Sequence, residues 1–425
     1  MIAARQIAFG RGAAKKEEPP AYGGLCFTAE SANSSVQLTA VGSAPAVTLV
    51  KSFDGVNWGN YAVGEVIDLP SVGDFVYLAA GEGGNNSFGA STTKYHKFVI
   101  NGLVASSGDI TSILNFDCAQ TALDKYCYVF MFRGCTGLTS APELPATTLA
   151  IGCYQRMFEN CTGLTSAPEL PATTLAPACY SYMFFGCTGL TSAPELPATT
   201  LANGCYQHMF EDCTGLTSAP ELPATTLAST CYAYMFAYCT GLTSAPKLPA
   251  TTLADSCYLD MFRNCTGLTS APVLPATTLA DSCYAYMFEN CTGLTSAPEL
   301  PATTLANSCY GYMFAGCTGL TSAPVLPATT LADSCYAYMF AYCTGLTSAP
   351  VLPATTLAIA CYAYMFRGCT NLSLIKVYFI SWEGGNTDSW LNNVSPTGTF
   401  YKPTALPEEY GGSKIPTGWT VINED

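Results

Sequence analysis

A 26-residue sequence repeat dominates this chain and limits what it can fold into. Nine complete units run without a gap from Cys135 to Gly368, and 19 of the 26 positions are identical in all nine units. The units follow the pattern CTGLTSAPxLPATTLAxxCYxxMFxx, in which x marks a variable position. A unit this short cannot bury an apolar face by itself, so consecutive units must stack into a solenoid with a shared core.

The first half of each unit predicts a short strand. In the first unit, apolar residues recur at Leu138, Ala141 and Leu144. Pro142 and Pro145 lie in the same segment and have no amide proton to offer a neighbouring strand. We therefore expect a strand that is short or bulged, with neighbouring units about 4.8 Å apart.

The second half of each unit predicts a short helix. Its apolar positions recur every fourth residue, which is close to the period of one helix face: Leu149, Cys153, Met157 and Cys161. At about 100° per residue, the constant positions fall on one half of a helical wheel and the variable positions on the other. We expect the constant half to face the core and the variable half to face solvent.

The unit resembles those of the BspA-like leucine-rich repeat family. The resemblance rests on CTGLTSAPELP followed by MF-x-x-C, and the matching residues of the first unit are Cys135, Leu138, Ala141, Leu144, Pro145, Met157, Phe158 and Cys161. It implies an α/β leucine-rich-repeat solenoid of strand plus helix, displayed on a bacterial, protist or phage surface for adhesion or recognition. It implies no catalytic residues.

The segments around the array at 135–368 differ from it in composition. Residues 25–107 alternate β-rich runs with Gly and Asp turn signals, which predicts a small β-sandwich-like domain. These runs are Val36–Thr39, Val47–Val50, Glu65–Leu69, Phe75–Leu78 and Lys97–Ile100. We expect residues 108–134 and 369–425 to be caps, because the end units of a solenoid otherwise expose its core.

Residues 1–24 predict an anchoring arm. The segment is rich in Pro and Gly and carries the basic residues Arg5, Arg11, Lys15 and Lys16. Its apolar stretches are too interrupted for a secretory signal. This composition favours a segment that orders against a partner, which we expect to be another protein of a phage virion.

Twenty of the 22 cysteines fall in two columns of the repeat, and only Cys26 and Cys118 lie outside them. Three interpretations are open: reduced thiols stacked in the core, disulfides between units, or thiolate metal sites. Reduced thiols are favoured, because free cysteine packs as a small apolar residue. Metal sites are disfavoured, because no C-x-x-C motif or histidine column accompanies the cysteines.

Tyrosines at the variable positions are the candidate ligand-binding residues. Exposed tyrosine rings make good contacts with sugars and proteins, although the same rings could simply shield the flank of a helix. The candidates are Tyr182, Tyr234, Tyr238, Tyr286, Tyr312, Tyr338, Tyr342 and Tyr364.

Two other columns have simpler explanations. The position of Glu143 changes from mostly glutamate to mostly valine along the array, and we expect it to form a solvated rim. Thr139 and Ser140 recur in every unit and predict a polar face exposed to solvent. A repeating glycan is an alternative ligand for this polar face, and an ice lattice is a weaker one.

The composition argues against several function classes. With 30 acidic and 16 basic residues, the net charge of −14 disfavours nucleic acid as a partner. Two histidines leave little for general-base catalysis. The sequence contains no run of about 18 apolar residues, which argues against membrane insertion. No arrangement of catalytic residues is evident, so we expect neither an enzyme nor a bound cofactor or metal.

These patterns predict a non-enzymatic, surface-displayed recognition or adhesion protein that binds a protein or glycan on a cell surface. The favoured setting is a phage virion, as a head or tail fibre or decoration protein. A bacterial cell-surface adhesin and a purely structural spacer are the alternatives. The sequence is compatible with an oligomer.

Overall fold

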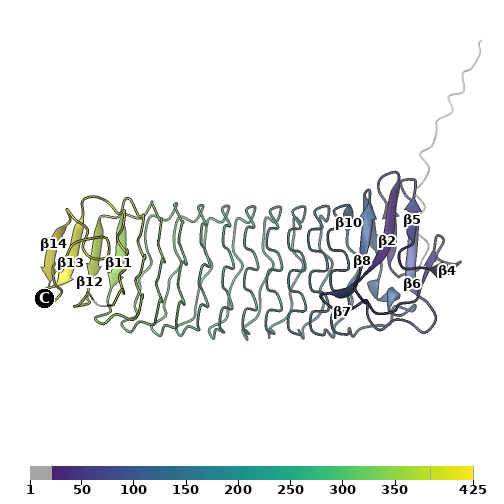
Figure 1. Cartoon of the computed structure of the whole chain (residues 1–425), viewed down its shortest axis with the longest axis horizontal. Coiled ribbons are helices and arrows are strands. Elements are labelled where there is room, and N and C mark those ends of the chain that lie inside the picture. Colours follow the sequence, from purple (N-terminus) through teal and green to yellow (C-terminus); the bar gives the residue numbers. More distant parts are fainter. Residues whose placement is uncertain (1–21, 383, 425) are drawn as a thin grey trace, which may run out of the picture.

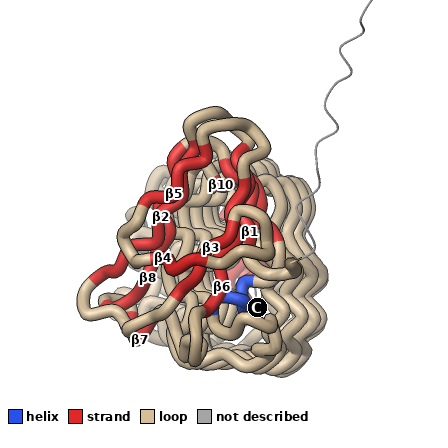
Figure 2. The backbone as a smooth tube through the Cα atoms, turned by 90° about the vertical axis from the view of Figure 1, so that its right-hand side faces the viewer, coloured by secondary structure: helices blue, strands red, loops and turns tan. Residues whose placement is uncertain are grey.

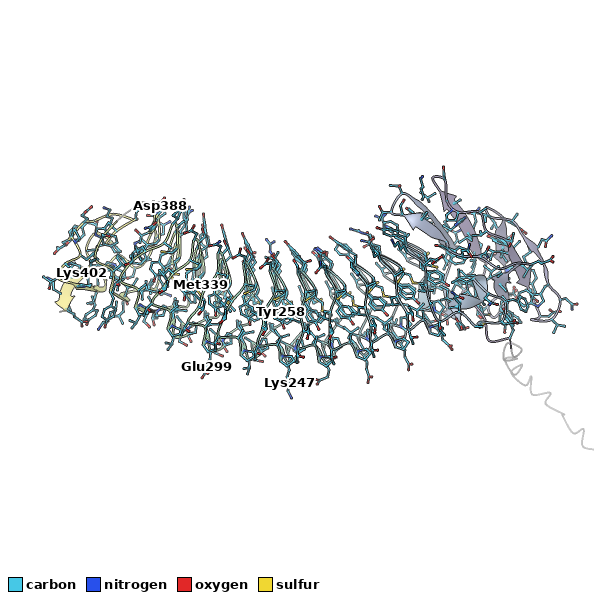
Figure 3. All side chains as sticks on the ribbon, turned by 90° about the horizontal axis from the view of Figure 1, so that it is seen from below. Lys247, Tyr258, Glu299, Met339, Asp388 and Lys402 are labelled. Carbon is cyan, nitrogen blue, oxygen red and sulfur yellow. The ribbon has the colours of Figure 1, made fainter. Side chains whose placement is uncertain are left out.

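The computed structural model describes residues 22–382 and 384–424, which form one elongated molecule (Figure 1). Two β-sheets lie at the N-terminal end, a regular solenoid fills the middle, and a small parallel sheet lies at the C-terminal end. From a second side the solenoid curves gently (Figure 3). The predicted anchoring residues Arg5, Arg11, Lys15 and Lys16 lie outside the described residues.

The two N-terminal sheets pack face to face. One contains β1 (Cys26–Ala29), β3 (Leu49–Ser52), β4 (Gly59–Tyr61), β6 (Phe75–Ala80), β9 (Val104–Ser107) and, from the first repeat unit, β10 (Leu138–Ser140). The other contains β2 (Ser34–Val41), β5 (Val66–Leu69), β7 (Gly89–Ser91) and β8 (Lys94–Asn101). Phe27 of β1 and Phe98 of β8 are buried with ring centroids 4.9 Å apart, which joins the sheets across one apolar core. All five predicted β-rich runs overlap these strands.

The helix predicted in the second half of each unit is wrong. Residues 151–160 and their equivalents form overlapping turns, and the only helix among the described residues is the short 3-10 helix η1 (Ile110–Ile113) (Figure 2). Successive backbone amides of this segment donate alternately within their own unit and to the next unit. The Met157 N–H donates to the Tyr154 carbonyl three residues earlier at 3.1 Å, whereas the Phe158 N–H donates to the Met183 carbonyl of the next unit at 2.9 Å.

Left-handed residues explain why the chain forms turns here. Gly152, Arg156 and Asn160 have φ values of 61°, 58° and 60°, and equivalent residues in the other units also have positive φ. A run of α-helix does not accommodate such residues, because each places Cβ too close to the following carbonyl. The buried side chains therefore recur every four residues, a spacing that resembles the 3.6-residue period of a helix.

The predicted direction of the constant half is confirmed. Cys153, Tyr154, Met157 and Phe158 are all fully buried, as are their equivalents in the other eight units. The apolar spacing therefore identified the inward side of the segment correctly, even though the backbone is not helical.

The strand predicted in the first half of each unit is present only at the two ends of the array. It forms β10 in the first unit and β11 (Ser348–Leu352) in the last. In the described units between them, neighbours share single backbone bonds such as that from the Thr191 N–H to the Thr165 carbonyl at 3.3 Å. The two prolines of each unit account for this, since they cannot donate to a ladder.

Columns of identical rings run through the core. The phenylalanines from Phe132 to Phe366 stack with centroids 5.3 to 5.7 Å apart. The tyrosines from Tyr128 to Tyr362 stack at 5.7 to 6.0 Å. Each stacked pair contributes roughly 0.5–1.5 kcal/mol beyond the burial of its area.

The cysteines are free thiols, and 21 of the 22 are buried. The Cys161 S–H donates to the Phe132 carbonyl, which lies 29 residues earlier, at 3.0 Å, and the same bond recurs along this column as far as Cys369. Among the described residues, no group of three or more His, Cys, Asp or Glu side chains is placed to hold a metal ion. The thiols therefore act as small buried groups that also bond one unit to the next.

Aromatic residues close both ends of the core. At the N-terminal end, Phe98 stacks on Phe132 with centroids 5.1 Å apart. At the C-terminal end, the fully buried Trp390 stacks on Tyr362 at 6.4 Å. There the chain forms the parallel sheet of β11, β12 (Leu374–Val377), β13 (Thr399–Pro403) and β14 (Thr420–Glu424).

The left-handed turns predict an unusual response to glycine. Ala178 has a φ of 53°, so Ala178→Gly should raise the free energy of unfolding by about 1 kcal/mol. Ala176→Gly, two residues earlier at a position without positive φ, is the matched control and should lower it. Denaturant unfolding of both variants measures the difference. A helix would make Ala178→Gly destabilising by about 1 kcal/mol, so the sign of the change decides between the two backbones.

The thiol column predicts slow cysteine chemistry. Burial raises the pKa of the Cys187 thiol to about 12, and the thiolate is the form that reacts. We expect alkylation of the native protein at neutral pH to be limited to the half-buried Cys118, whereas denaturant without reductant should release all 22 thiols. Mass spectrometry after alkylation counts them. Fewer than 22 modified cysteines in denaturant would instead indicate disulfides.

Candidate functional site

The variable positions of the units gather on the turn side of the solenoid. In the first unit they are residues 151, 152, 155, 156, 159 and 160. Residues 151 and 160 are exposed, and 155 and 156 are half-buried. Gly152 and Glu159 are buried instead, which differs from the expectation that the whole variable half faces solvent.

Four of the eight candidate tyrosines form a continuous stack. They occupy the position of Arg156 in successive units, which we call the ring column. Tyr286, Tyr312, Tyr338 and Tyr364 stack with centroid distances of 4.4, 4.2 and 4.3 Å and planes within 12° of parallel. Each has a left-handed backbone with φ between 57° and 59°, so the side chain leaves every unit at the same place.

This stacking limits how the tyrosines can contact a ligand. Both faces of Tyr312 and Tyr338 are covered by neighbouring rings, so a sugar cannot stack on them. The half-buried rings leave their edges and hydroxyl groups for contact. Burial, and then the neighbouring Tyr338 hydroxyl, raises the pKa of Tyr312, so this hydroxyl stays protonated and can donate hydrogen bonds.

The ring column continues through other planar side chains at its N-terminal end. The Arg156 guanidinium lies 3.8 Å from the centre of the Tyr182 ring, and His208 stacks on the other side of that ring at 4.1 Å. His208 also stacks on Tyr234 at 4.4 Å. The structure thus brings Tyr182 and Tyr234 together with a cation and a histidine that the sequence had not suggested as site residues.

Tyr238 and Tyr342 lie apart from the ring column. They are the most exposed of the eight candidates, at 37% and 50% of their full accessible area. The Tyr342 ring lies over Gly368, where a Cβ atom would come within 2.6 Å of the ring. These two rings are therefore separate contact points beside the ring column.

Asp260 interrupts the ring column between Tyr234 and Tyr286. Asp260 exposes only 2% of its accessible area, and its Oδ1 lies 3.5 Å from a guanidinium nitrogen of Arg263. Arg263 also pairs with Glu289 of the next unit at 2.7 Å. Burial raises the pKa of Asp260 to about 6, while the Tyr234 hydroxyl and Arg263 act in the opposite direction.

The sequence did not predict the cavities that lie along the edge of the solenoid formed by the two prolines of each unit. Between the first two units, Pro142, Pro145 and Pro168 help to line a cavity of about 560 Å³. Similar cavities of about 350, 330 and 290 Å³ recur between later units. Prolines without amide protons keep neighbouring backbones from pairing here, which leaves a groove. The residues at the Glu143 position are exposed in all nine units and form the rim of this edge.

The stacked turns, the short strands at both ends and the repeating core define a solenoid of the leucine-rich-repeat type. The sequence pattern described as the BspA type leucine rich repeat region matches residues 125–269 and 229–373, which together span more than half of the chain. The protein therefore belongs to the BspA-type leucine-rich repeat family.

Other comparisons add no relative. No curated protein and no solved structure matches this chain. In the part of the chain that the structure describes, no helix is long and apolar enough to cross a membrane.

The buried Asp260 predicts a pH-dependent stability. Its pKa is about 6 in the folded protein against a usual value of 3.8, so between these pH values the folded state retains a proton that the unfolded state has lost. Stability should therefore fall as pH rises from about 4 to 6, by up to about 3 kcal/mol from this group. Asp260→Asn should remove this contribution.

Unfolding free energies of the Asp260→Asn variant and the parent, measured at several pH values, test the sign. The matched control is Asp255→Asn, which changes an exposed carboxylate of the same unit. A stability difference between parent and Asp260→Asn that stays constant from pH 4 to 6 would contradict the assignment.

Proposed function

We propose that this protein is a non-enzymatic recognition or adhesion protein whose solenoid presents the turn side to a protein or glycan on a cell surface. Its family suggests a surface, adhesion-type repeat protein. The observation that carries the proposal is the separation of constant and variable positions. The core columns are identical in every unit, whereas most of the sequence variation lies in the turn segment, where the position of Ile151 is exposed in eight of the nine units.

The geometry of that side supports a broad contact surface. The ring column provides hydroxyl groups and ring edges at a regular spacing, with Tyr238 and Tyr342 beside it. Tyrosine supplies large contact area with few rotatable bonds, which lowers the entropy lost on binding. Several weak contacts at fixed spacing on a rigid support can then add to a useful affinity.

We propose a phage virion as the place of display, in a head or tail fibre or decoration protein. The basic and Pro/Gly-containing arm at 1–24, with Arg5, Arg11, Lys15 and Lys16, supports attachment to another virion protein. A bacterial cell-surface adhesin and a spacer without a ligand are the competing proposals, and each gives a different result below.

A binding screen of the full-length chain against bacterial cells and glycans tests recognition. We expect the combined Tyr286, Tyr312, Tyr338 and Tyr364→Ala variant to bind at least about tenfold more weakly, because it loses both the ring edges and the hydroxyl groups. The corresponding four Tyr→Phe changes keep the stack and isolate the hydroxyl contribution. Tyr410→Ala, which removes an exposed ring outside the solenoid, is the control.

The outcomes separate the three proposals. A chain that binds no surface, and whose behaviour the four Tyr→Ala changes leave unaltered, would leave the spacer as the remaining explanation. Equal binding without the four tyrosines would instead place the contact outside the ring column. Deleting residues 1–21 of the arm, which retains Tyr22 and its contacts, should abolish incorporation into phage particles while ligand binding persists. An adhesin would show binding without any incorporation of the intact chain.

A further inference from the structure

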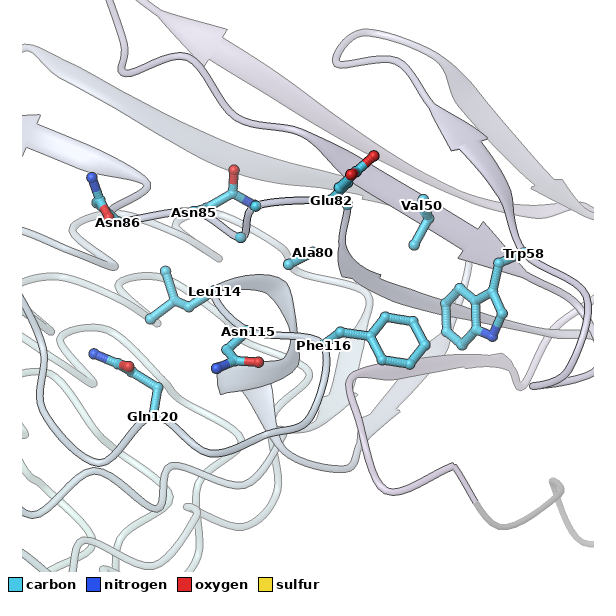
Figure 4. A pocket seen from close by; sticks show the side chains of 13 residues that line it. Val50, Trp58, Ala80, Glu82, Asn85, Asn86, Leu114, Asn115, Phe116 and Gln120 are labelled. Atoms are coloured by element: carbon cyan, nitrogen blue, oxygen red, sulfur yellow. The ribbon is translucent and has the colours of Figure 1, made fainter.

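A separate groove lies in the N-terminal part of the molecule, away from the turn side of the solenoid. It has a volume of about 620 Å³ and runs between the loop at 81–86 and the segment at 114–120 (Figure 4). This volume is within the range of about 300–1,000 Å³ that small-molecule sites occupy.

The two walls of the groove are fixed to each other by one side chain. The Asn85 amide donates to the Thr48 carbonyl at 2.9 Å and to the Ile113 carbonyl at 2.8 Å, and its oxygen accepts from the Thr48 N–H. Gly84 allows the walls to approach closely, since a Cβ there would lie 2.8 Å from the Leu114 carbonyl. The groove therefore exists before any ligand binds.

One end of the groove is aromatic. Trp58 and Phe116 contact each other edge to face with centroids 5.0 Å apart. Tyr22 packs on both rings at 4.9 and 5.3 Å and donates its hydroxyl to the Phe116 carbonyl, which holds them in place. Phe116 keeps 37% of its area exposed, so the groove offers an apolar surface in a fixed orientation.

The other end of the groove is polar, and the described residues that line it include no cation. Figure 4 shows Asn86, Asn115 and Gln120 on the side of the groove away from the rings, and Glu82 between Asn85 and Val50 at its rim. The Asn115 oxygen and the Gln120 amide nitrogen are used in bonds to the backbone, which leaves the opposite atom of each amide for a ligand. Within the described residues, the side chains of Glu82 and Asn86 make no hydrogen bond of their own.

This combination selects a class of ligand. A pyranose ring has one face of C–H groups, which packs against an aromatic side chain, and a rim of hydroxyl groups that both donate and accept hydrogen bonds. Amides and a carboxylate match that rim. Phosphates and acidic sugars are disfavoured, because among residues 22–382 and 384–424 no lysine or arginine lines the groove to balance their charge.

We propose that this groove is a binding site for a neutral carbohydrate, with the sugar ring against Trp58 and Phe116 and its hydroxyl groups on Glu82, Asn86, Asn115 and Gln120. The site goes beyond the recognition proposed for the solenoid and needs none of its tyrosines. The chain would then carry two contact regions of different chemistry, one on the turn side of the solenoid and one in the N-terminal part.

Tryptophan fluorescence of the full-length chain gives a direct test. Trp58 is the only tryptophan of the N-terminal part, and the other three lie at 382, 390 and 419. Titration with neutral gluco-, manno-, galacto- and chito-oligosaccharides should shift the emission saturably for at least one series. The shift should disappear in Trp58→Phe, which keeps a ring while removing the reporter.

Affinity measured by calorimetry then assigns the contacts. We expect Trp58→Ala and Phe116→Ala each to weaken binding at least about tenfold, and Glu82→Gln or Asn86→Ala severalfold. Phe53→Ala removes a 55% exposed ring of the same part that does not line the groove, and should leave affinity unchanged. Circular dichroism checks that each variant is folded.

Three results would overturn the proposal. They are no saturable response to any neutral series, equal binding after Trp58→Ala and Phe116→Ala, or a preference for anionic sugars or nucleotides. Sugar binding that appears only after deletion of residues 1–21 would also overturn it for the whole chain, and would name the arm as the occupant. None of these results bears on the tyrosine variants of the solenoid, so the two proposals fail independently.

Discussion

The ladder of backbone hydrogen bonds between neighbouring units is the interaction on which the rest of the structure depends. Alternate amides of the turn segment donate to the next unit, such as Phe158 N–H to the Met183 carbonyl, while the amides between them close turns within their own unit. This alternation requires a left-handed residue at every fourth position. Because all units satisfy the same rule, each side chain recurs directly above its equivalent, and identical residues form continuous columns.

The columns then determine what the core and the surface can do. Inside, stacked phenylalanines, tyrosines and thiols fill the solenoid, and the aromatic residues Phe98 and Trp390 close its ends. Outside, the same register stacks the tyrosines of the ring column face to face at 4.2 to 4.4 Å. The feature that makes the solenoid regular therefore also removes the ring faces from contact with ligands and leaves their edges.

The repeat length, the inward direction of the constant residues and the positions of the N-terminal strands could be predicted from the sequence. The helix could not be excluded by apolar spacing, because four residues and 3.6 residues differ little over three turns. The positions of Gly152 and Asn160 held the missing signal. Across the units they are filled mostly by Gly, Asn, Asp and Ser, which is typical of left-handed and turn residues and rare in helix interiors. The groove at Trp58 was not predictable, since Glu82 and Phe116 reach it from distant segments.

The ring column is variable in sequence but restricted in chemistry. Eight of its nine residues are planar groups that stack, namely arginine, histidine and tyrosine, and the ninth, Asp260, is buried and paired with Arg263. A side chain at this position must tolerate a left-handed backbone and stack on the neighbouring ring. These two requirements limit how far it can vary to fit a ligand. The position of Ile151 carries neither restriction, since it lacks a positive φ, is exposed in eight of the nine units and holds residues as different as Ile, Pro, Asn and Asp. Selectivity between ligands should therefore reside mainly in the Ile151 column, with the ring column as its support.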